Sequence, residues 1–372
     1  MHRDQMSTSA QRVWAEINLS ALRQNAQVAA QPGGGKVAVL AVVKANAYGH
    51  GLAEVAKAVA GEVQLFGVAN LQEAQTARAV VDHPIVILGP ALPAEREGIV
   101  RGGFVASVSS VEEAQAFSAM AGGGTAQLDC VIDTGMGRMG LAERDAIAAV
   151  KKIAELPRVK IQSVSTHLPA ADEDAVFTTK QLANFDALIA ELHREVPGDY
   201  LVHAMPSAGV LGFSSGSCDV VRPGLMLYGV SPLPEFQRLV QPVMTLKARI
   251  ALLREMPAGG SISYGRTFIA PQAMRVATLS VGYADGLPRS LSNRGAAVLI
   301  GGRRCAVLGR VTMDLTMVDV TESPEVEVGD EVVLMGRQGD EQILATEVAE
   351  RAGTIAWEVF TGIGSRVARV YV

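Results

Sequence analysis

Short apolar runs alternate with helix-like segments between about residues 37 and 230 of the chain. The runs do not alternate with polar residues, which indicates strands covered on both faces, and the connecting helices indicate a parallel sheet. The predicted strands are Val37–Val43, Leu65–Ala69, Ile85–Leu88, Phe104–Val108, Leu128–Ile132, Ile161–Ser165, Tyr200–Ala204 and Val220–Val221. Eight strands with helices between them predict a (β/α)₈ barrel. An open doubly wound sheet is the alternative, but no G-x-G-x-x-G follows the first strand.

Helices are predicted before and between these strands. The first covers Ser20–Gln31, with Ser20 as its N-cap residue. The others are rich in Ala, Glu and Gln, and they cover Leu71–Val81, Val111–Met120, Glu143–Glu155 and Phe177–Val196. They supply the crossover connections that a parallel sheet requires.

The pattern changes after about residue 240. Short, often β-branched segments are separated by Gly-rich or Gly-Asp turns, which predicts a mainly β domain. Its strands are expected at Thr245–Ala251, Met274–Val281, Ala297–Ile300, Leu315–Val320, Glu331–Met335 and Arg366–Tyr371, and its only helix at Thr346–Ala352. We therefore expect a barrel domain of residues 13–240 and a β domain of residues 241–372, with residues 1–12 packed on the latter.

The composition indicates a globular protein without nucleic-acid or membrane partners. Of 372 residues, 49% are hydrophobic and 19% charged, and the net charge of −5 argues against a concentrated basic face. No run approaches about 18 apolar residues, and the N-terminus lacks the apolar core of a secretory signal. The three cysteines, Cys130, Cys218 and Cys305, form neither a disulfide framework nor a metal pattern, and we expect them in apolar surroundings. These features favour a reducing cytoplasm.

Polar residues stand where several predicted barrel strands end, and a barrel places its active site at that face. Lys44 and Tyr48 follow the first strand, Arg138 the fifth, His167 the sixth, His203 and Ser207 the seventh and Arg222 the eighth. Taken singly, a lysine can extend to solvent, a histidine can be a hydrogen-bonded core residue and an arginine can pair with a carboxylate. Their joint occurrence at five strand ends favours a functional site.

Lys44 closes a strand of Val, Ala and Leu, so we expect its ammonium group to be partly desolvated and its pKa lowered from about 10.4. A lysine in this setting suits Schiff-base chemistry with an aldehyde cofactor. Pyridoxal phosphate would also need a phosphate site and a partner for its ring nitrogen. Ser207, Tyr48 and the backbone around Gly224 can bind phosphate, and an arginine can contact the nitrogen.

Seven segments are most informative when they are taken together. The most specific is Ala41-Val42-Val43-Lys44-Ala45-Asn46-Ala47-Tyr48-Gly49-His50-Gly51. The others are Trp14–Leu19 with Ala21, Leu22 and Asn25, then Asp133–Gly140, Val221–Gly224, Ser263–Gly265, Gly282–Gly286 and Met313–Asp314. In this order they resemble the alanine racemase family, in which the lysine holds pyridoxal phosphate. The resemblance covers nearly the whole chain from Arg12 onward.

The resemblance implies a racemase that interconverts L- and D-alanine with pyridoxal 5'-phosphate and supplies D-alanine for cell-wall peptidoglycan. It also implies a head-to-tail homodimer with shared active sites, in which two bases flank the α-carbon of the substrate. Lys44 would carry the cofactor as a Schiff base and act as one base, and Tyr264 of the partner subunit would be the other.

The resemblance assigns further roles by position. Arg222 would face the pyridine nitrogen, and Arg138 and the backbone of Met313 would hold the substrate carboxylate. Tyr48, Ser207, Gly224, Leu225 and Trp357 would bind the cofactor phosphate. His167 and His203 would support the network around Arg222 and Tyr264. Asp172, Tyr283, Arg289, Arg310 and Ile355 would line the passage through which substrate enters.

Three positions depart from the family pattern. Pro206 stands where an asparagine usually precedes the phosphate-binding serine, so an amide and a backbone donor are lost. Val131 stands where many members have a carbamylated lysine that orients the substrate-binding arginine, so Arg138 needs another support. Trp357 stands in place of a tyrosine, and its indole can donate but not accept a hydrogen bond. These changes concern substrate and cofactor positioning rather than the two bases.

Three other functions compete with this expectation. A basic amino-acid decarboxylase would need a cysteine-containing Asp-rich motif late in the chain and a glycine triplet near the phosphate, and neither stands at the expected place. A non-catalytic pyridoxal phosphate carrier consists of a barrel alone, whereas this chain adds the segment with Tyr264 and Met313. A racemase of serine, or of longer or more varied amino acids, is the closest alternative because the three departures lie near the predicted pocket.

Overall fold

The computed structural model describes residues 11–31 and 37–372, which form two compact units. The barrel unit contains the described parts of Ala21–Ala47 and Gly51–Gln241. The β unit contains the described residues up to Ser20, together with Tyr48–His50 and Pro242–Val372. The expectation that residues 1–12 pack on the β domain lies almost entirely outside the described residues.

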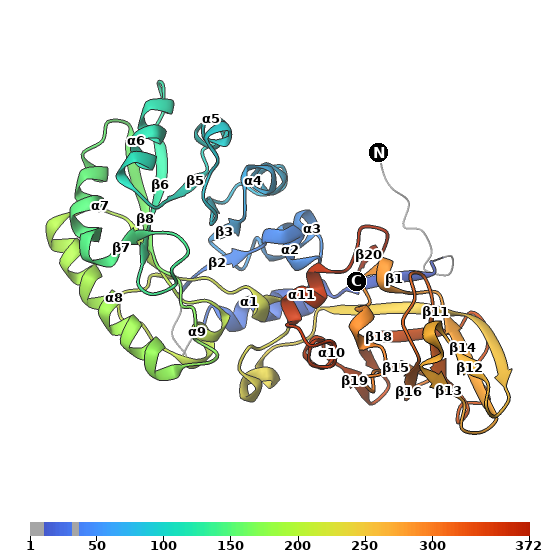
Figure 1. Ribbon diagram of the computed structural model, residues 1–372. Helices are drawn as coiled ribbons and strands as arrows, with labels where there is room; N and C mark the ends of the chain where they lie inside the picture. The colour runs from blue at the N-terminus through green and yellow to red at the C-terminus, as the bar shows by residue number, and fades with distance from the viewer. Residues whose placement is uncertain (1–10, 32–36) are drawn as a thin grey trace. The chain divides into compact units, whose positions relative to one another are not determined.

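Within the described residues of the barrel unit, eight parallel strands close into a ring (Figure 1). Their order is β2-β3-β4-β5-β6-β8-β9-β10, and β10 pairs again with β2. The strands are β2 Ala38–Val42, β3 Leu65–Val68, β4 Ile85–Ile87, β5 Val105–Val108, β6 Ala126–Asp133, β8 Val159–Ser165, β9 Leu201–His203 and β10 Val220–Val221, with β7 Leu141–Ala142 paired to the end of β6. The predicted (β/α)₈ barrel is therefore confirmed.

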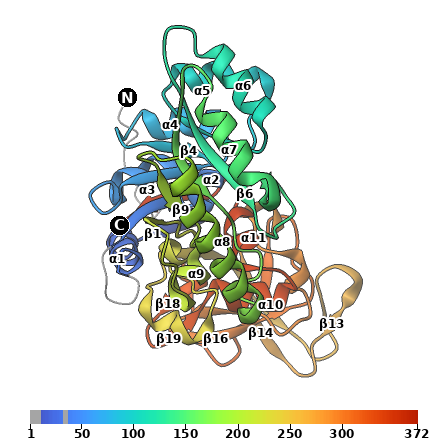
Figure 2. The same cartoon turned by 90° about the vertical axis from the view of Figure 1, so that its left-hand side faces the viewer.

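Helices cover the outside of this barrel, and several consecutive ones pack side by side (Figure 2). They are α1 Leu19–Ala29, α3 Leu52–Val59, α4 Leu71–Arg78, α5 Arg96–Arg101, α6 Val111–Met120, α7 Ala146–Ala154, α8 Ala175–Glu195 and α9 Ser207–Gly212, with 3₁₀ turns at Pro93–Glu95, Glu143–Asp145, Leu225–Tyr228 and Pro234–Leu239. Asn70, Ser110 and Asp174 cap α4, α6 and α8 by accepting a backbone N–H three residues further on. Among the described residues, no helix has the length and apolar character needed to cross a bilayer.

The predicted N-cap of the first helix is wrong. Helix α1 begins at Leu19, so Ser20 lies inside its first turn. Asn18, another residue type favoured at an N-cap, stands directly before the helix.

The β unit contains a second closed ring. Within the described residues, β11, β14, β17, β16, β15 and β18 form a closed ring of antiparallel pairs. The strands of this unit are β1 Val13–Ile17, β11 Met244–Met256, β12 Ser261–Ile262, β13 Phe268–Ile269, β14 Met274–Leu279, β15 Ala297–Ile300, β16 Arg303–Leu308, β17 Thr316–Asp319, β18 Glu331–Gln338, β19 Glu341–Ile343 and β20 Ala368–Tyr371. The prediction that a mainly β domain follows the barrel is confirmed.

Two features of the β unit differ from the sequence prediction. Helix α10 (Ala345–Ala352) is not the only helix, because α11 (Ala356–Thr361) follows after a left-handed Gly353. Short 3₁₀ turns add Tyr264–Arg266, Tyr283–Asp285 and Arg289–Leu291. The barrel domain was expected to begin at residue 13, whereas β1 pairs antiparallel with β11 and parallel with β20. The local pattern of a strand does not identify a pairing partner that lies far away in the chain.

Candidate active site

The carboxyl ends of the barrel strands bring together the predicted polar residues of the barrel unit. Lys44 comes just after β2, Arg138 after β6, His167 after β8, and Arg222 just after β10. Ser207 begins α9, which follows β9. Because all the strands of a parallel barrel point the same way, these side chains stand at one end of it.

Lys44 lies in an environment that disfavours its charged form. Burial, followed by the charges of Arg138 and Arg222, lowers the pKa of its ammonium group, while Glu73 acts in the opposite direction. This is the direction expected from the apolar strand. A lysine whose pKa is lowered is partly deprotonated nearer neutral pH, and it can then act as a nucleophile or a base.

The chain leaves Lys44 through a left-handed turn, α2 Lys44–Tyr48. Ala45, Asn46, Ala47 and Tyr48 have φ angles of 52°, 54°, 54° and 51°. Left-handed helical backbone costs about 1–2 kcal/mol per residue for L-amino acids other than glycine, so contacts must hold this turn. Such conformations persist where the surrounding structure fixes them, and they cluster at functional sites.

Arg222 is fixed by three acceptors. Its Nη2 donates to the carbonyl oxygen of Thr166, to that of Ala204 at 3.2 Å and to Nδ1 of His167 at 3.1 Å. A guanidinium group only donates, so His167 must accept through Nδ1 and carry its proton on Nε2. Burial, then the charges of Arg222, Arg138 and Lys44, lower the pKa of His167 to about 3. His167 is therefore a neutral acceptor at neutral pH.

Burial lowers the pKa of Arg222 to about 10, which leaves the guanidinium charged at neutral pH. Among the described residues, its buried Nε has no hydrogen-bond partner. A buried donor of this kind normally finds an acceptor. Arg222 can therefore hydrogen-bond a further group at this end of the barrel.

A buried carboxylate inside the barrel was missed by the sequence analysis. Asp129 is 1% exposed and accepts hydrogen bonds from Ser107, Ser163 and Ser165 at 3.0, 2.9 and 2.9 Å. His203 Nε2 lies 3.4 Å from Asp129 Oδ1. Burial acts to raise the pKa of Asp129, but His203 and the serine hydroxyls lower it overall. A charged residue inside an otherwise apolar strand was the signal that could have revealed this group.

His203 and Arg222 are linked through this carboxylate rather than by a direct hydrogen bond among the described residues. The charge of Asp129 acts to raise the pKa of Arg222 against the effect of burial. Asp129 thus helps to keep the guanidinium charged.

Ser207 joins the backbone of the loop after β10. Its Oγ accepts the N–H groups of Gly224 at 3.0 Å and Met226 at 3.2 Å, and Leu225 lies between them. Because Oγ accepts twice, its own hydroxyl proton can donate to another group. Pro206 occupies the N-cap position of α9 and makes no side-chain cap hydrogen bond.

The loop that carries Arg138 is shaped by Asp133. The Asp133 carboxylate accepts the N–H groups of Gly135 and Gly137 at 3.0 Å. Gly140 has a φ of +125°, and a Cβ there would lie 2.7 Å from the Asp133 nitrogen, so the loop requires glycine. Arg138 is exposed and makes no ion pair or side-chain hydrogen bond with the described residues. No described side chain therefore replaces the support that Val131 cannot give.

Gln181 of α8 is another residue near the site that was not predicted from the sequence. Its Nε2 donates to Thr134 Oγ1 at 2.8 Å and to the His167 carbonyl at 3.1 Å. The hydroxyls of Thr134 and Thr166 lie 2.7 Å apart. Helix α8 thereby holds the backbone of His167. Asp172, by contrast, is exposed in the loop before this helix.

Other predicted site residues belong to the β unit. Tyr264 is 72% exposed at the start of its 3₁₀ turn, and the preceding Ser263 donates to the Arg310 carbonyl at 2.5 Å. Met313 is exposed, and its carbonyl accepts the N–H of Ala284 at 3.0 Å. Tyr283 begins the 3₁₀ turn Tyr283–Asp285, and Arg289 begins the turn Arg289–Leu291. Ile355 stands directly before α11, and Trp357 lies inside that helix. Burial raises the pKa of Tyr48 to about 12, so its hydroxyl stays a donor.

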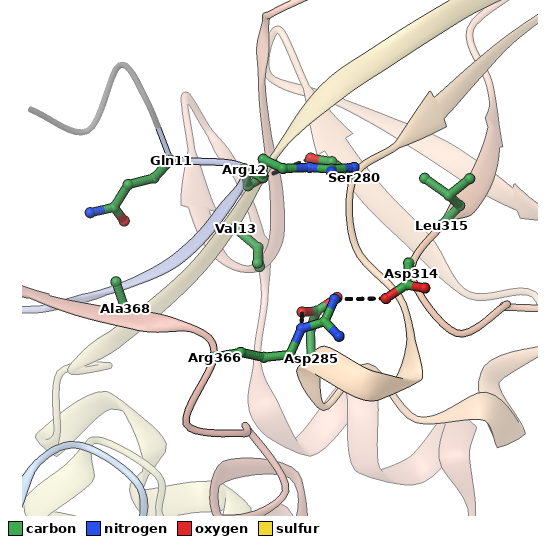
Figure 3. A pocket seen from close by; sticks show the side chains of 9 residues that line it. All are labelled: Gln11, Arg12, Val13, Ser280, Asp285, Asp314, Leu315, Arg366 and Ala368. Carbon is green, nitrogen blue, oxygen red and sulfur yellow. Dashed lines mark hydrogen bonds and ion pairs between the residues drawn. The ribbon is translucent and has the colours of Figure 1, made fainter.

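The residue after Met313 lines a cavity of about 530 Å³ in the β unit (Figure 3). Arg366 Nε lies 2.8 Å from Asp285 Oδ1, and its Nη2 lies 2.7 Å from Asp314 Oδ1. Asp285 is buried, whereas Arg366 and Asp314 are about half exposed. This ion-pair network ties the segment with Met313 to the turn with Tyr283.

Comparison with known proteins covers nearly the whole chain. The family model "Alanine racemase, N-terminal domain" matches residues 17–232, and "Alanine racemase, C-terminal domain" matches residues 243–371. The chain belongs to the alanine racemase family. The alanine racemase of Halothermothrix orenii is 41% identical over 96% of both chains. That of Methylacidiphilum infernorum is also 41% identical, over 97% of this chain and 92% of the relative.

Solved structures of the alanine racemase family have the same fold. The alanine racemase of Clostridium difficile 630 has a TM-score of 0.91 and 32% identity, over 98% of this chain and 96% of that chain. The biosynthetic alanine racemase of Pseudomonas aeruginosa has a TM-score of 0.88 and 33% identity, over 97% of this chain and 99% of that one. The predicted family and isomerase class are confirmed. The match to both domains sets aside the barrel-only carrier and the decarboxylase.

Proposed function

We propose that this protein interconverts L- and D-alanine with pyridoxal phosphate as cofactor. Membership of the alanine racemase family supports the reaction. The observation that carries the proposal is Lys44, a lysine at a barrel strand end whose pKa is lowered by burial, Arg138 and Arg222. A lysine amine in such an environment can form a Schiff base with an aldehyde cofactor.

The groups at the barrel end suit this cofactor. Lys44 would hold it through its amine, and Arg222, with its buried Nε donor, would face the ring nitrogen. The hydroxyl of Ser207 and the backbone at Gly224 and Leu225 form a polar cluster that suits a phosphate. Tyr48 and Trp357 would add an O–H and an N–H donor. When bound, pyridoxal phosphate supplies an aldehyde for the amino group and a ring that withdraws electrons from the α-carbon.

The reaction requires a proton to leave one face of the α-carbon and return to the other. Lys44 would serve one face, and Tyr264 of the partner subunit would serve the other. Arg138 and the backbone of Met313 would hold the carboxylate of the substrate. Arg222 does not readily give up a proton. With neutral His167 as its acceptor, Arg222 would keep its charge and would not give a proton to the ring nitrogen of the cofactor.

We further propose a homodimer with shared sites. The 72% exposure of the Tyr264 side chain supports this arrangement, because a base at the surface of one subunit can reach a second chain. Asp172, Tyr283, Arg289, Arg310 and Ile355 would line the substrate passage, and His203 would support the site through Asp129. We propose that the product D-alanine would serve peptidoglycan synthesis; the similar Pseudomonas aeruginosa enzyme is a biosynthetic alanine racemase.

A broader substrate range is the alternative within the same chemistry. Arg138 has no supporting partner among the described side chains, Val131 offers no polar group, and Pro206 removes a donor beside Ser207. Looser positioning of the substrate would allow serine or longer amino acids to react. The rates at which alanine, serine and longer amino acids are racemised distinguish the two cases.

The decisive experiment is chiral chromatography of products. The protein, loaded with pyridoxal phosphate, is incubated separately with L-alanine, L-serine and longer L-amino acids. We expect D-alanine to form fastest. The Lys44→Ala variant, purified in the same way, is the control for racemase carried over from the expression host. Absence of D-alanine from a fully loaded protein would overturn the proposal. Faster turnover of another amino acid would support the alternative.

A second measurement locates the cofactor independently of turnover. Reduction with borohydride followed by peptide mapping should place the cofactor on Lys44. An adduct on a different lysine would end the assignment of Lys44.

A further inference from the structure

The carboxylate of Glu73, in the first turn of α4, contacts two strand-end loops at once. Its Oε2 accepts the N–H of Ala69 at 2.9 Å, directly after β3. Its Oε1 accepts the N–H of Asn46 at 3.0 Å, in the left-handed turn after Lys44. Its own backbone N–H donates to the Asn70 side chain at 3.0 Å. One residue therefore joins the cap of α4 to the turn that carries Lys44.

Helix α6 has the same cap without this link. Glu113 donates its backbone N–H to the Ser110 hydroxyl at 3.1 Å, and its Oε2 accepts the N–H of Ser109 at 2.7 Å. Within the described part of the chain, Glu113 makes no further side-chain hydrogen bond. Helix capping thus accounts for one oxygen of Glu73 but not for the oxygen that reaches Asn46.

The left-handed turn needs a contact from outside itself. The Asn46 side chain accepts the N–H of Leu52 at 2.9 Å, and the Asn46 carbonyl accepts that of Gly51 at 3.0 Å. Both partners lie in the segment that continues the turn. Ala45 and Asn46 are exposed, so packing does little to hold them. Among the described residues, the bond to Glu73 is the one hydrogen bond that joins Asn46 to a separate element of the barrel unit.

We propose that Glu73 is a positioning residue for Lys44, because its carboxylate anchors the left-handed turn to α4 and places a negative charge in the surroundings of the amine. The inference rests on the proposed function for the role of Lys44 in the reaction. Arg138, Arg222 and Glu73 are the charged groups that act on Lys44, and the charge of Lys44 acts in turn on neutral His167. After burial, the two arginines lower the pKa of Lys44, and Glu73 raises it. Glu73 thus opposes the two arginines.

Matched glutamine variants test the charge. The full-length protein is freed of cofactor, and acetylation of Lys44 is followed against pH by peptide mass spectrometry. In Glu73→Gln the midpoint should move to lower pH by up to about one unit, because a neighbour that favoured the ammonium form has lost its charge. Glu113→Gln should keep the wild-type midpoint. The proposal is overturned by equal midpoints in wild type and Glu73→Gln, or by equal shifts in both variants.

Matched alanine variants test the anchor. Hydrogen–deuterium exchange of the peptide that covers residues 44–51 should be faster in Glu73→Ala, by about tenfold or more, because local opening is less opposed. Glu113→Ala should leave that peptide unchanged, although each variant loses one capping contact. Unchanged exchange in Glu73→Ala would contradict the anchoring role. If Glu73→Ala does not fold, the acetylation midpoint of Lys44 in Glu73→Gln still tests whether Glu73 acts on Lys44.

Neither measurement depends on turnover of alanine. A wild-type protein that racemises nothing would overturn the proposed function, while the acetylation midpoints would still show whether Glu73 acts on Lys44. Conversely, an active wild type with unshifted midpoints would overturn only the role of Glu73.

Discussion

His167 makes the stability of the protein depend on pH. Its pKa is 6.5 in ordinary surroundings and about 3 beside Arg222 in the barrel. Between these values the unfolded chain binds the extra proton and the folded chain does not, so the free energy of unfolding falls as pH drops below 6.5. His167→Asn keeps an acceptor for Arg222 without this titration. Between pH 7 and pH 5, the free energy of unfolding measured in urea should fall by about 1–2 kcal/mol more in wild type than in the variant. Equal losses in the two proteins would contradict this.

Tyr264 can be tested as the second base. Tyr264→Phe keeps the ring but removes the phenol oxygen, so racemisation should fall in both directions by on the order of 10²–10⁴-fold. Each direction needs one base and the conjugate acid of the other. In heavy water, α-deuteration followed by mass spectrometry should persist for D-alanine, from which Lys44 would take the proton, and should fail for L-alanine. Equal deuteration of both enantiomers would reject this assignment, and deuteration of L-alanine alone would reverse it.

Helix α8 has a capped N-terminus and also carries a residue that contacts the candidate active site. Its N-cap Asp174 accepts the N–H of Phe177 at 2.9 Å, and its Gln181 holds the carbonyl of His167 at 3.1 Å. Asp174→Ala should lower the free energy of unfolding by about 1 kcal/mol, because a cap and a negative charge at the helix N-terminus are lost. Chemical denaturation measures this change. The neighbouring exposed Glu173→Ala is the control, and an equal loss in that variant would argue against capping as the cause.

At the scale of the whole molecule, the proposed dimer with shared active sites can be tested directly. Lys44→Ala and Tyr264→Phe should each be nearly inactive as a pure protein. If each site takes Lys44 from one subunit and Tyr264 from the other, mixing the variants should form hybrid dimers with one intact and one doubly altered site. Activity should then recover in part as subunits exchange. No recovery, despite exchange shown by native mass spectrometry of differently tagged chains, would mean that one chain supplies both bases.

The sequence by itself determined the features that depend on local pattern. Eight apolar runs identified the barrel strands, since a strand covered on both faces is apolar throughout wherever it pairs. The polar residues that follow these runs identified one end of the barrel, because parallel strands place their ends together. The lowered pKa of Lys44 also followed from its apolar strand. The ordered motifs then identified the family.

Only the tertiary structure decided the contacts between residues distant in the chain. β1 pairs with β11 and β20, more than two hundred residues away. The pattern of hydrophobic and polar residues in β1 does not identify those partners. The hydrogen bonds of Asp129 to three serines and the bond of Glu73 to Asn46 join separate strands and loops. Periodicity reports whether a residue faces the core or the solvent. It does not report which side chain stands opposite, because that depends on how distant segments pack.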